Sequence, residues 1–84
     1  MPQGSWFRLR RELYAVTLDP YDLHELTRGF LPVGTLVEQP LTTIREAETH
    51  HLDAVAIRMR TSEDAIQIGV ARVATESLRA AVRV

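Results

Sequence analysis

The chain lacks cysteine, lysine and asparagine altogether. Without cysteine it can form neither a disulfide nor a thiolate zinc site, and it has no thiol nucleophile, so packing and pairing must hold the fold together. All ten basic residues are arginine, which GC-rich codons explain more simply than selection for guanidinium groups. We therefore expect a bacterial source.

Long apolar runs are absent as well. No run approaches the roughly 18 residues that a helix needs to cross a bilayer, and the first residues, MPQGSWFRLRRE, lack the apolar stretch of a secretion signal. These features predict a soluble, cytoplasmic protein with no membrane partner.

The chain is short but ordinary in composition. Of its 84 residues, 45% are hydrophobic and 25% are charged, as in globular proteins generally. This length predicts one small domain, residues 1–84, that buries only about 60% of the surface that its unfolded chain exposes. Such a core leaves a thin margin of stability, so a homodimer or higher homo-oligomer is expected.

Charge is distributed unevenly along the chain, although the net charge is only −1. Residues 1–18 have three arginines and one acid, residues 19–53 have two arginines and seven acids, and residues 54–84 have five arginines and three acids. Basic ends and an acidic middle can steer a partner or a second copy of the chain.

Two stretches alternate as β-strands do. From residue 6 to 18 the apolar positions follow one parity and then change phase at Arg11–Glu12, which predicts a bend or bulge. Residues 54–60 and 65–73 predict a hairpin around the polar quartet 61–64. Its apolar face is expected to hold Val55, Ile57, Met59, Ile66, Ile68 and Val70.

Three other segments leave alternatives open. Residues 20–29 suit either a helix begun by Asp19 and Pro20 or a hairpin-like excursion on the Asp-Pro turn. Residues 41–52 favour a strand that leads into an exposed polar loop or short helix. Residues 75–84 suit either a helix capped by Thr75 or a 3₁₀ turn followed by a last strand.

The stretch GFLPVGTLVE, residues 29–38, contains two glycines but no phosphate-loop spacing and no lysine. Residues 33–38 predict a strand between Pro32 and Pro40. Gly34 is interpreted as the point where this strand bends sharply.

The order of the predicted pieces resembles an SH3-like small β-barrel. The pieces are a first strand, a polar excursion, a strand that opens with a glycine, a central hairpin, a short turn and a last strand: LYAVTL, the excursion, VGTLVE, AVAIRMR with IQIGVARV, ATESL and AAVRV. The resemblance implies a mainly β fold of about five strands with one short helix or 3₁₀ turn. The alternative is an α+β antiparallel sheet with one or two short helices. The hairpin has no tryptophan, so a groove for proline-rich peptides is not expected.

Catalytic, cofactor-binding and metal-binding residues are not predicted, and neither is a small-molecule substrate. The polar run REAETHHLD contains Glu46, Glu48, His50, His51 and Asp53, but adjacent histidines point apart on a strand and lie far apart around a helix. We therefore interpret it as a solvated segment. No nucleophile, base and orienting group stand together, so we expect no enzyme.

The expected function is a non-enzymatic protein-interaction or assembly module that can associate with itself, because the chain is small and has apolar residues near its start. If the first and last strands pair, arginines from both would form a basic patch beside Trp6, and nucleic-acid binding is the alternative function. The residues expected to contribute to binding are Trp6, Arg8, Arg10, Tyr14, Tyr21, Arg79 and Arg83.

Overall fold

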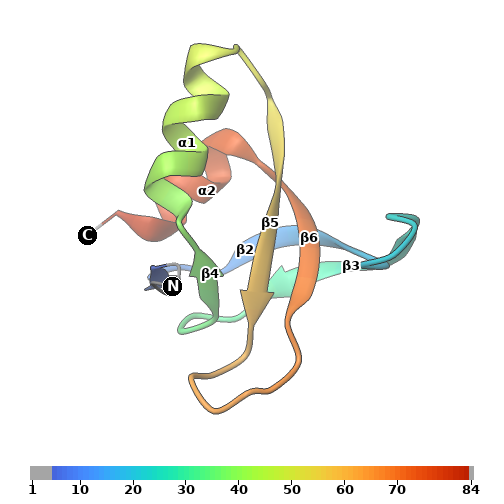
Figure 1. Ribbon diagram of the computed structural model, residues 1–84. Helices are drawn as coiled ribbons and strands as arrows, with labels where there is room; N and C mark the ends of the chain where they lie inside the picture. Colours follow the sequence, from blue (N-terminus) through green and yellow to red (C-terminus); the bar gives the residue numbers. More distant parts are fainter. Residues whose placement is uncertain (1–4, 84) are drawn as a thin grey trace.

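The computed structural model describes residues 5–83 and consists of one antiparallel sheet with two short helices (Figure 1). The strands and helices follow one another as β1 (Trp6–Arg8), β2 (Leu13–Leu18), β3 (Glu25–Leu31), β4 (Leu36–Glu38), α1 (Pro40–Thr49), β5 (Ala54–Arg60), β6 (Gly69–Ala74) and α2 (Thr75–Val82). The strand order in the sheet is β1-β4-β5-β6-β2-β3. This agrees with the predicted mainly β or α+β class.

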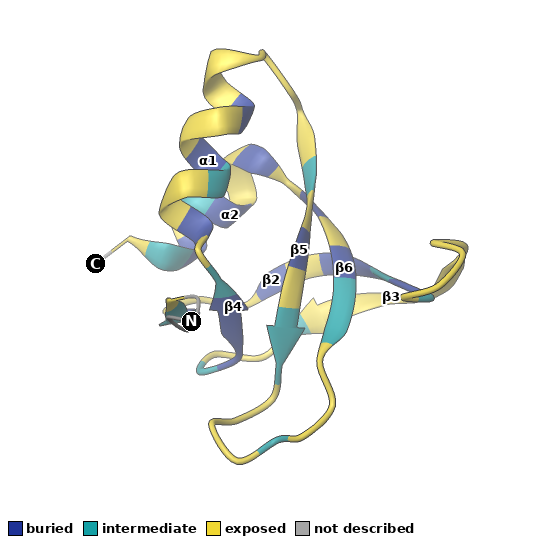
Figure 2. Cartoon of the chain, in the orientation of Figure 1, coloured by how far each residue is buried: buried dark blue, intermediate teal, exposed yellow. Residues whose placement is uncertain are grey.

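The core lies where the two helices pack against the sheet, and buried positions gather there (Figure 2). Alternate residues of β2, β5 and β6 turn to the same face of the sheet, and Leu13, Ala15, Ile57, Ala71 and Val73 are buried there. The buried apolar residues of the cluster are Leu9, Leu13, Ala15, Val37, Ile44, Ile57, Ala71, Val73, Leu78 and Ala81. Among the described residues, no helix is both long and apolar enough to cross a bilayer.

The predicted bend in the first strand is confirmed, since the chain leaves the sheet between β1 and β2. Leu9 is buried in this bend, its N–H donates to the Thr35 carbonyl at 2.8 Å, and its own carbonyl accepts from the Gly34 N–H at 2.8 Å. β1 consequently pairs with β4 at one edge of the sheet, whereas β2 pairs with β6 and β3. The sheet is not closed by pairing, so an SH3-like barrel is not confirmed.

The β5–β6 hairpin is confirmed, but its second strand is shorter than predicted and has the opposite phase. β6 begins at Gly69, and Ala71 and Val73 are buried in place of the predicted isoleucines and Val70. At the start of β6, a residue without a side chain is needed because Met59 of β5 lies against it. A side chain on Gly69 would bring its Cβ within 3.2 Å of the Met59 Cε.

Residues 41–52 are mostly helical, so the predicted strand is wrong. Pro40 begins α1, where its missing N–H costs nothing, and Ile44 and Ala47 are buried against the core. Packing of this face outweighs the strand preference of Thr42 and Thr43. The polar end of the segment lies in the last turn of α1 and in the loop after it.

Residues 75–82 form a helix, α2, which is the first of the two alternatives for the last segment. The predicted pairing of the first strand with a last strand is therefore absent among the described residues, and β1 pairs with β4. Thr75 is its first residue and does not cap it. Its hydroxyl donates to the Leu52 carbonyl at 2.9 Å and its N–H donates to the Asp53 carbonyl at 2.8 Å. These bonds attach the start of α2 to the loop that precedes β5.

Residues 20–29 form the hairpin alternative, with β2 and β3 joined by a tight turn. The Asp19 Oδ1 accepts from the N–H groups of Tyr21 at 2.8 Å and Asp22 at 3.2 Å, and these bonds hold the pKa of Asp19 below its ordinary value. Leu23 has a positive φ of 62° in this turn. The turn places β3 at the edge of the sheet.

Gly34 lies at a sharp change of direction, as expected, but in the turn before β4 and not within a strand. Gly34 has a φ of 92°, which a residue with a side chain rarely adopts, and it lies in the turn between β3 and β4. The Thr35 hydroxyl donates to the Pro32 carbonyl at 2.8 Å and closes the turn. β4 starts only at Leu36, later than predicted.

Candidate binding surface

β3 is an edge strand whose outer side is unpaired by any described strand. All its residues from Glu25 to Phe30 are exposed, and Leu31 is half-buried (Figure 2). An unpaired row of backbone N–H and C=O groups is a template for another strand. The edge has few features that oppose the addition of a strand: the charged residues Glu25 and Arg28, and the irregular pairing beside Leu18. We call it the β3 edge.

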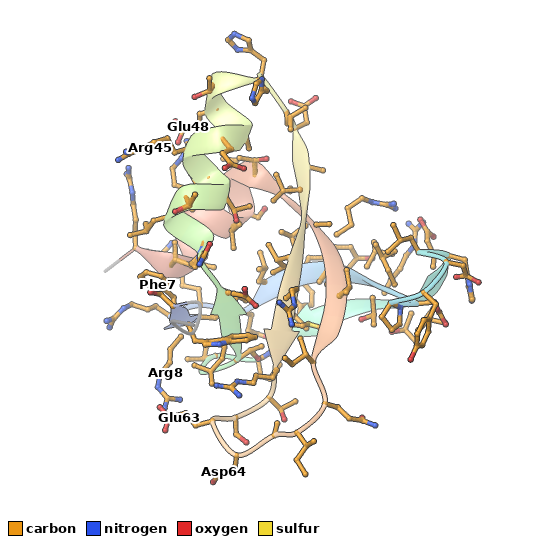
Figure 3. All side chains as sticks on the ribbon, viewed as in Figure 1. Phe7, Arg8, Arg45, Glu48, Glu63 and Asp64 are labelled. Atoms are coloured by element: carbon orange, nitrogen blue, oxygen red, sulfur yellow. The ribbon has the colours of Figure 1, made fainter. Side chains whose placement is uncertain are left out.

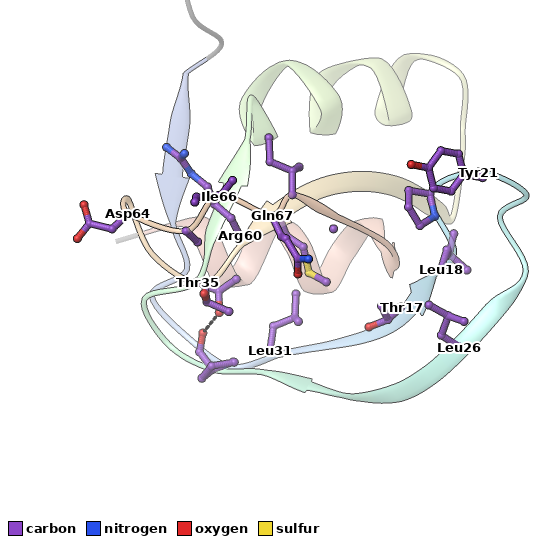
Figure 4. A pocket seen from close by; sticks show the side chains of 17 residues that line it. Thr17, Leu18, Tyr21, Leu26, Leu31, Thr35, Arg60, Asp64, Ile66 and Gln67 are labelled. Atoms are coloured by element: carbon purple, nitrogen blue, oxygen red, sulfur yellow. Dashed lines mark hydrogen bonds between the residues drawn. The ribbon is translucent and has the colours of Figure 1, made fainter.

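A pocket of about 850 Å³ adjoins the β3 edge, between the β2–β3 hairpin and the loop that joins β5 to β6 (Figure 4). Leu26 and Leu31 of β3 line it together with Met59 at the end of β5. The other large apolar side chains of the lining are Leu18, Tyr21, Ile66 and Ile68. We call it the β3 pocket.

Large apolar side chains at this pocket are left in water. Tyr21 is 96% exposed, Ile66 is 95% exposed and Leu26 is 52% exposed. Soluble monomers seldom gather such side chains around one hollow unless another molecule covers them. The β3 pocket is therefore the best candidate for a binding surface in the described part of the chain.

Polar groups occupy the other end of the pocket lining. Arg60 extends toward β1, where its guanidinium carbon lies 4.4 Å from the centre of the Trp6 ring. The Arg60 Nε is buried and has no hydrogen-bond partner among the described residues. Thr35 and Gln67 add neutral donors and acceptors near the pocket (Figure 4).

The opposite face of β2 and β3 holds an aromatic pair and an ion-pair cluster. The Tyr14 and Phe30 rings lie edge to face with centroids 5.3 Å apart. The Glu25 carboxylate accepts from Arg28 at 2.7 Å and from Arg72 at 2.5 Å. The two arginines hold the pKa of Glu25 below its ordinary value, and Glu25 raises the pKa of Arg28. These contacts fix β3 to β2 and β6 despite its exposure.

The predicted binding residues do not come together at one place. Tyr21 lines the β3 pocket, Trp6 touches it only through Arg60, and Tyr14 lies on the other face of the sheet. The Arg8 Nη2 lies 2.9 Å from the Glu63 Oε1 (Figure 3).

The remaining arginines of the predicted patch lie near α2. The Arg10 N–H donates to the Ala81 carbonyl of α2 at 2.6 Å. Arg79 and Arg83 belong to α2 and its end, and the Arg79 Nη2 lies 3.2 Å from the Glu48 Oε2 of α1. The patch expected from pairing of the first and last strands is thus divided, since α2 takes the place of a last strand.

Leu26 and Ile66 are pocket residues that the sequence did not point to. Leu26 lies in residues 20–29, for which the sequence allows either a helix or a hairpin, so the sequence does not assign it to an edge strand. Ile66 continues the alternation of the predicted strand, but β6 begins only at Gly69. The polar quartet 61–64 and Gln67 do indicate a loop longer than a tight hairpin needs, and Ile66 lies in that loop.

Asp19, Asp22 and His24 form a group whose potential ligand atoms lie within 4.8 Å of one another. The hydrogen bonds of the β2–β3 turn account for this arrangement. The Asp22 Oδ1 accepts from the His24 N–H at 3.0 Å and lies 2.5 Å from the His24 Nδ1.

Comparisons of this chain with protein-family models, with curated proteins and with solved structures find no match. The geometry of the β3 edge and the β3 pocket must therefore carry the functional argument.

Proposed function

We propose that this protein is a non-enzymatic interaction module that binds an extended segment of a partner protein along the β3 edge. The observation that carries the proposal is an exposed edge strand that borders an apolar pocket. Backbone pairing with β3 would supply affinity, and the β3 pocket would select the side chains. The expected setting is the bacterial cytoplasm.

The geometry also suggests what the segment looks like. β3 has seven residues and therefore spans about 23 Å at roughly 3.3 Å per residue. A strand added to β3 turns alternate side chains to one face, so apolar residues at every second position would enter the pocket beside Leu26 and Leu31. The preferred partner is a short stretch of alternating apolar and polar residues.

The proposal also relates to the SH3-like resemblance, because binding would add a strand to an open sheet. The curved sheet stops at β3, and a strand added there would extend it further around the β3 pocket. Self-association is the homotypic form of the proposal, in which a second copy supplies the segment. Self-association would use the same β3 edge, and a measurement of the mass in solution tests it.

A peptide selection tests the proposal directly. A phage-displayed library of random peptides is selected on the immobilised protein, and enriched peptides are synthesised and measured by isothermal titration. We expect alternating apolar positions in the enriched peptides and loss of binding in Leu26→Lys, because a lysine on the edge both blocks pairing and charges the pocket.

Leu52→Lys is the matched control. Leu52 is 50% exposed and Leu26 is 52% exposed, and Leu52 lies in the loop between α1 and β5, outside the β3 pocket. It should leave the peptide affinity unchanged. Selected peptides that bind Leu26→Lys as tightly as the original protein, or a selection that enriches no peptide, would contradict the proposal.

A further inference from the structure

A second groove of about 430 Å³ lies between α1 and α2. It shares no lining residue with the β3 pocket. We call it the helix groove, and its lining consists of Leu41, Ile44, Arg45, Glu48 and Thr49 from α1, Arg79 and Val82 from α2, and Arg83 directly after α2.

Helical spacing explains why these side chains meet. In α1 the lining residues recur every third or fourth position from Leu41 to Thr49, so they form one stripe along the helix. In α2 and directly after it, Arg79, Val82 and Arg83 do the same. Ile44 is 6% exposed at the floor of the groove, whereas Leu41 is 58% exposed at its border. The groove thus has an apolar floor that is only partly covered.

The charge of the helix groove is predominantly positive. Three arginines line it and Glu48 is its single acid. The Arg79 Nη2 lies 3.2 Å from the Glu48 Oε2, an ion pair that joins the two helices. Arg45 and Arg83 form no salt bridge with any acid among residues 5–83. Two guanidinium groups are therefore free to bind an anion.

We propose that the helix groove binds an acidic amphipathic segment of a partner protein, with apolar side chains on Leu41, Ile44 and Val82 and carboxylates on Arg45 and Arg83. Arginine presents a planar fork of donors that fits a carboxylate in two parallel hydrogen bonds. An amphipathic helix laid in a groove places apolar residues three or four positions apart, with acids beside them. Figure 3 shows Arg45 and Glu48 projecting from the same side of α1, where such a segment would lie.

The lining favours a protein acid over a nucleic acid. Arg79 is already engaged by Glu48, so only Arg45 and Arg83 remain to bind anions, whereas nucleic-acid binding usually depends on contacts with many phosphates. Proteins that bind single-stranded nucleic acids also stack the bases on aromatic side chains, and the lining of the helix groove contains no aromatic residue. Its apolar floor instead suits leucine, isoleucine or valine side chains of a peptide.

Fluorescence anisotropy tests the proposal with a defined probe. The probe is a short fluorescein-labelled peptide of leucine and glutamate with helical spacing, and its partner probe has glutamine in place of glutamate. The acidic peptide should bind the protein and weaken as salt rises, whereas the glutamine peptide should bind much more weakly. Substitution of Arg45→Gln together with Arg83→Gln should weaken the acidic peptide roughly tenfold, the combined effect of two exposed ion pairs.

Matched variants separate this surface from general charge effects. Arg58→Gln with Arg72→Gln removes the same two charges from exposed side chains of β5 and β6 that face away from the buried core positions, and it should leave the affinity unchanged. Arg45→Lys with Arg83→Lys keeps the charge and should retain most of the binding. Leu26→Lys should have no effect, which separates the helix groove from the proposed function at the β3 edge.

Three outcomes would overturn the proposal. The first is equal affinity of the acidic peptide for the original protein and for the Arg45→Gln, Arg83→Gln variant, provided that both have the same circular dichroism spectrum. The second is equal binding of the glutamine peptide. The third is a single-stranded DNA oligonucleotide that binds more tightly than the peptide and loses its affinity in the same variant, which would assign the groove to nucleic acid.

Discussion

Glu25 is the residue whose ionisation is coupled most directly to the architecture of the β3 edge. It accepts hydrogen bonds from Arg28 on its own strand and from Arg72 on β6, which lies on the far side of β2. Both arginines favour the charged carboxylate, so the pKa of Glu25 in the folded protein lies below its ordinary value of 4.5. The pair of contacts acts as a clamp across three strands.

The pKa of Glu25 should therefore be measurably lowered in solution. Because the folded pKa is the lower one, the clamp stabilises the fold above pH 4.5 and its contribution is lost as the pH falls through the folded pKa. A titration of the carboxyl carbon by NMR should give a pKa below 4.5, and Arg72→Gln should raise it. Arg58→Gln, whose partner is Glu38, is the control and should not move it. A Glu25 pKa of 4.5 or above in the original protein would exclude the clamp.

Leu78 is the residue where α2 is anchored to the sheet. It is 0% exposed and belongs to the core cluster. Leu78→Ala should lower the free energy of unfolding by about 2–5 kcal/mol, because a cavity replaces its methyl groups. Urea unfolding followed by circular dichroism measures the loss. Leu41→Ala, at an exposed position of α1, should change stability by no more than about 0.5 kcal/mol. Similar effects of the two substitutions would mean that α2 does not pack as described.

At the scale of elements, the turn between β3 and β4 depends on one glycine. Gly34 has a φ of 92°, and a Cβ there would meet nothing within 4 Å, so only the backbone conformation opposes a side chain. Gly34→Ala should destabilise the protein by about 1–2 kcal/mol. Gly29→Ala is the control, because Gly29 has open space around it and no positive φ. Equal urea midpoints for the two variants would contradict this account of the turn.

The sequence predicted the elements whose pattern is local and missed those that tertiary packing decides. Alternation identified β5 and the broken first strand, since one face of each is buried. It misjudged β6, because apolar residues stand at both odd and even positions of residues 65–73, and only the packing of the sheet decides that Ala71 and Val73 face inward instead of Val70. It misjudged α1, whose Thr42 and Thr43 favour a strand but whose Ile44 and Ala47 are buried as a helical stripe.

The candidate surfaces were predictable only in part for the same reason. Tyr21 and the arginines of α2 stood out as exposed groups able to bind. The β3 pocket and the helix groove each combine residues from distant parts of the chain, such as Leu26 with Ile66 or Arg45 with Arg83. Their positions depend on strand order and helix packing, which the sequence pattern leaves open.

At the scale of the whole molecule, the protein exposes more surface than its size requires. Its accessible surface is 5973 Å², whereas a compact monomer of 9.5 kDa exposes roughly 5,000 Å². The excess is close to the roughly 800 Å² that each partner buries in an interface of standard size. The unpaired β3 edge and the apolar side chains around the β3 pocket contribute to this excess, so a partner on that side would give the molecule an ordinary ratio of surface to mass.

The same reasoning predicts that the protein associates with itself when no other partner is present. Sedimentation equilibrium should give an average mass that rises above 9.5 kDa with protein concentration. Leu26→Lys should stay at the monomer mass, because a charged side chain on β3 opposes strand addition. Leu52→Lys, whose side chain lines neither the β3 pocket nor the helix groove, should associate like the original protein. Association that persists in Leu26→Lys would place the interface elsewhere. If the original protein is strictly monomeric, self-association is excluded. Binding of a foreign segment would then still be decided by the peptide selection, because a second copy must bring its own β3 edge into register and a free peptide need not.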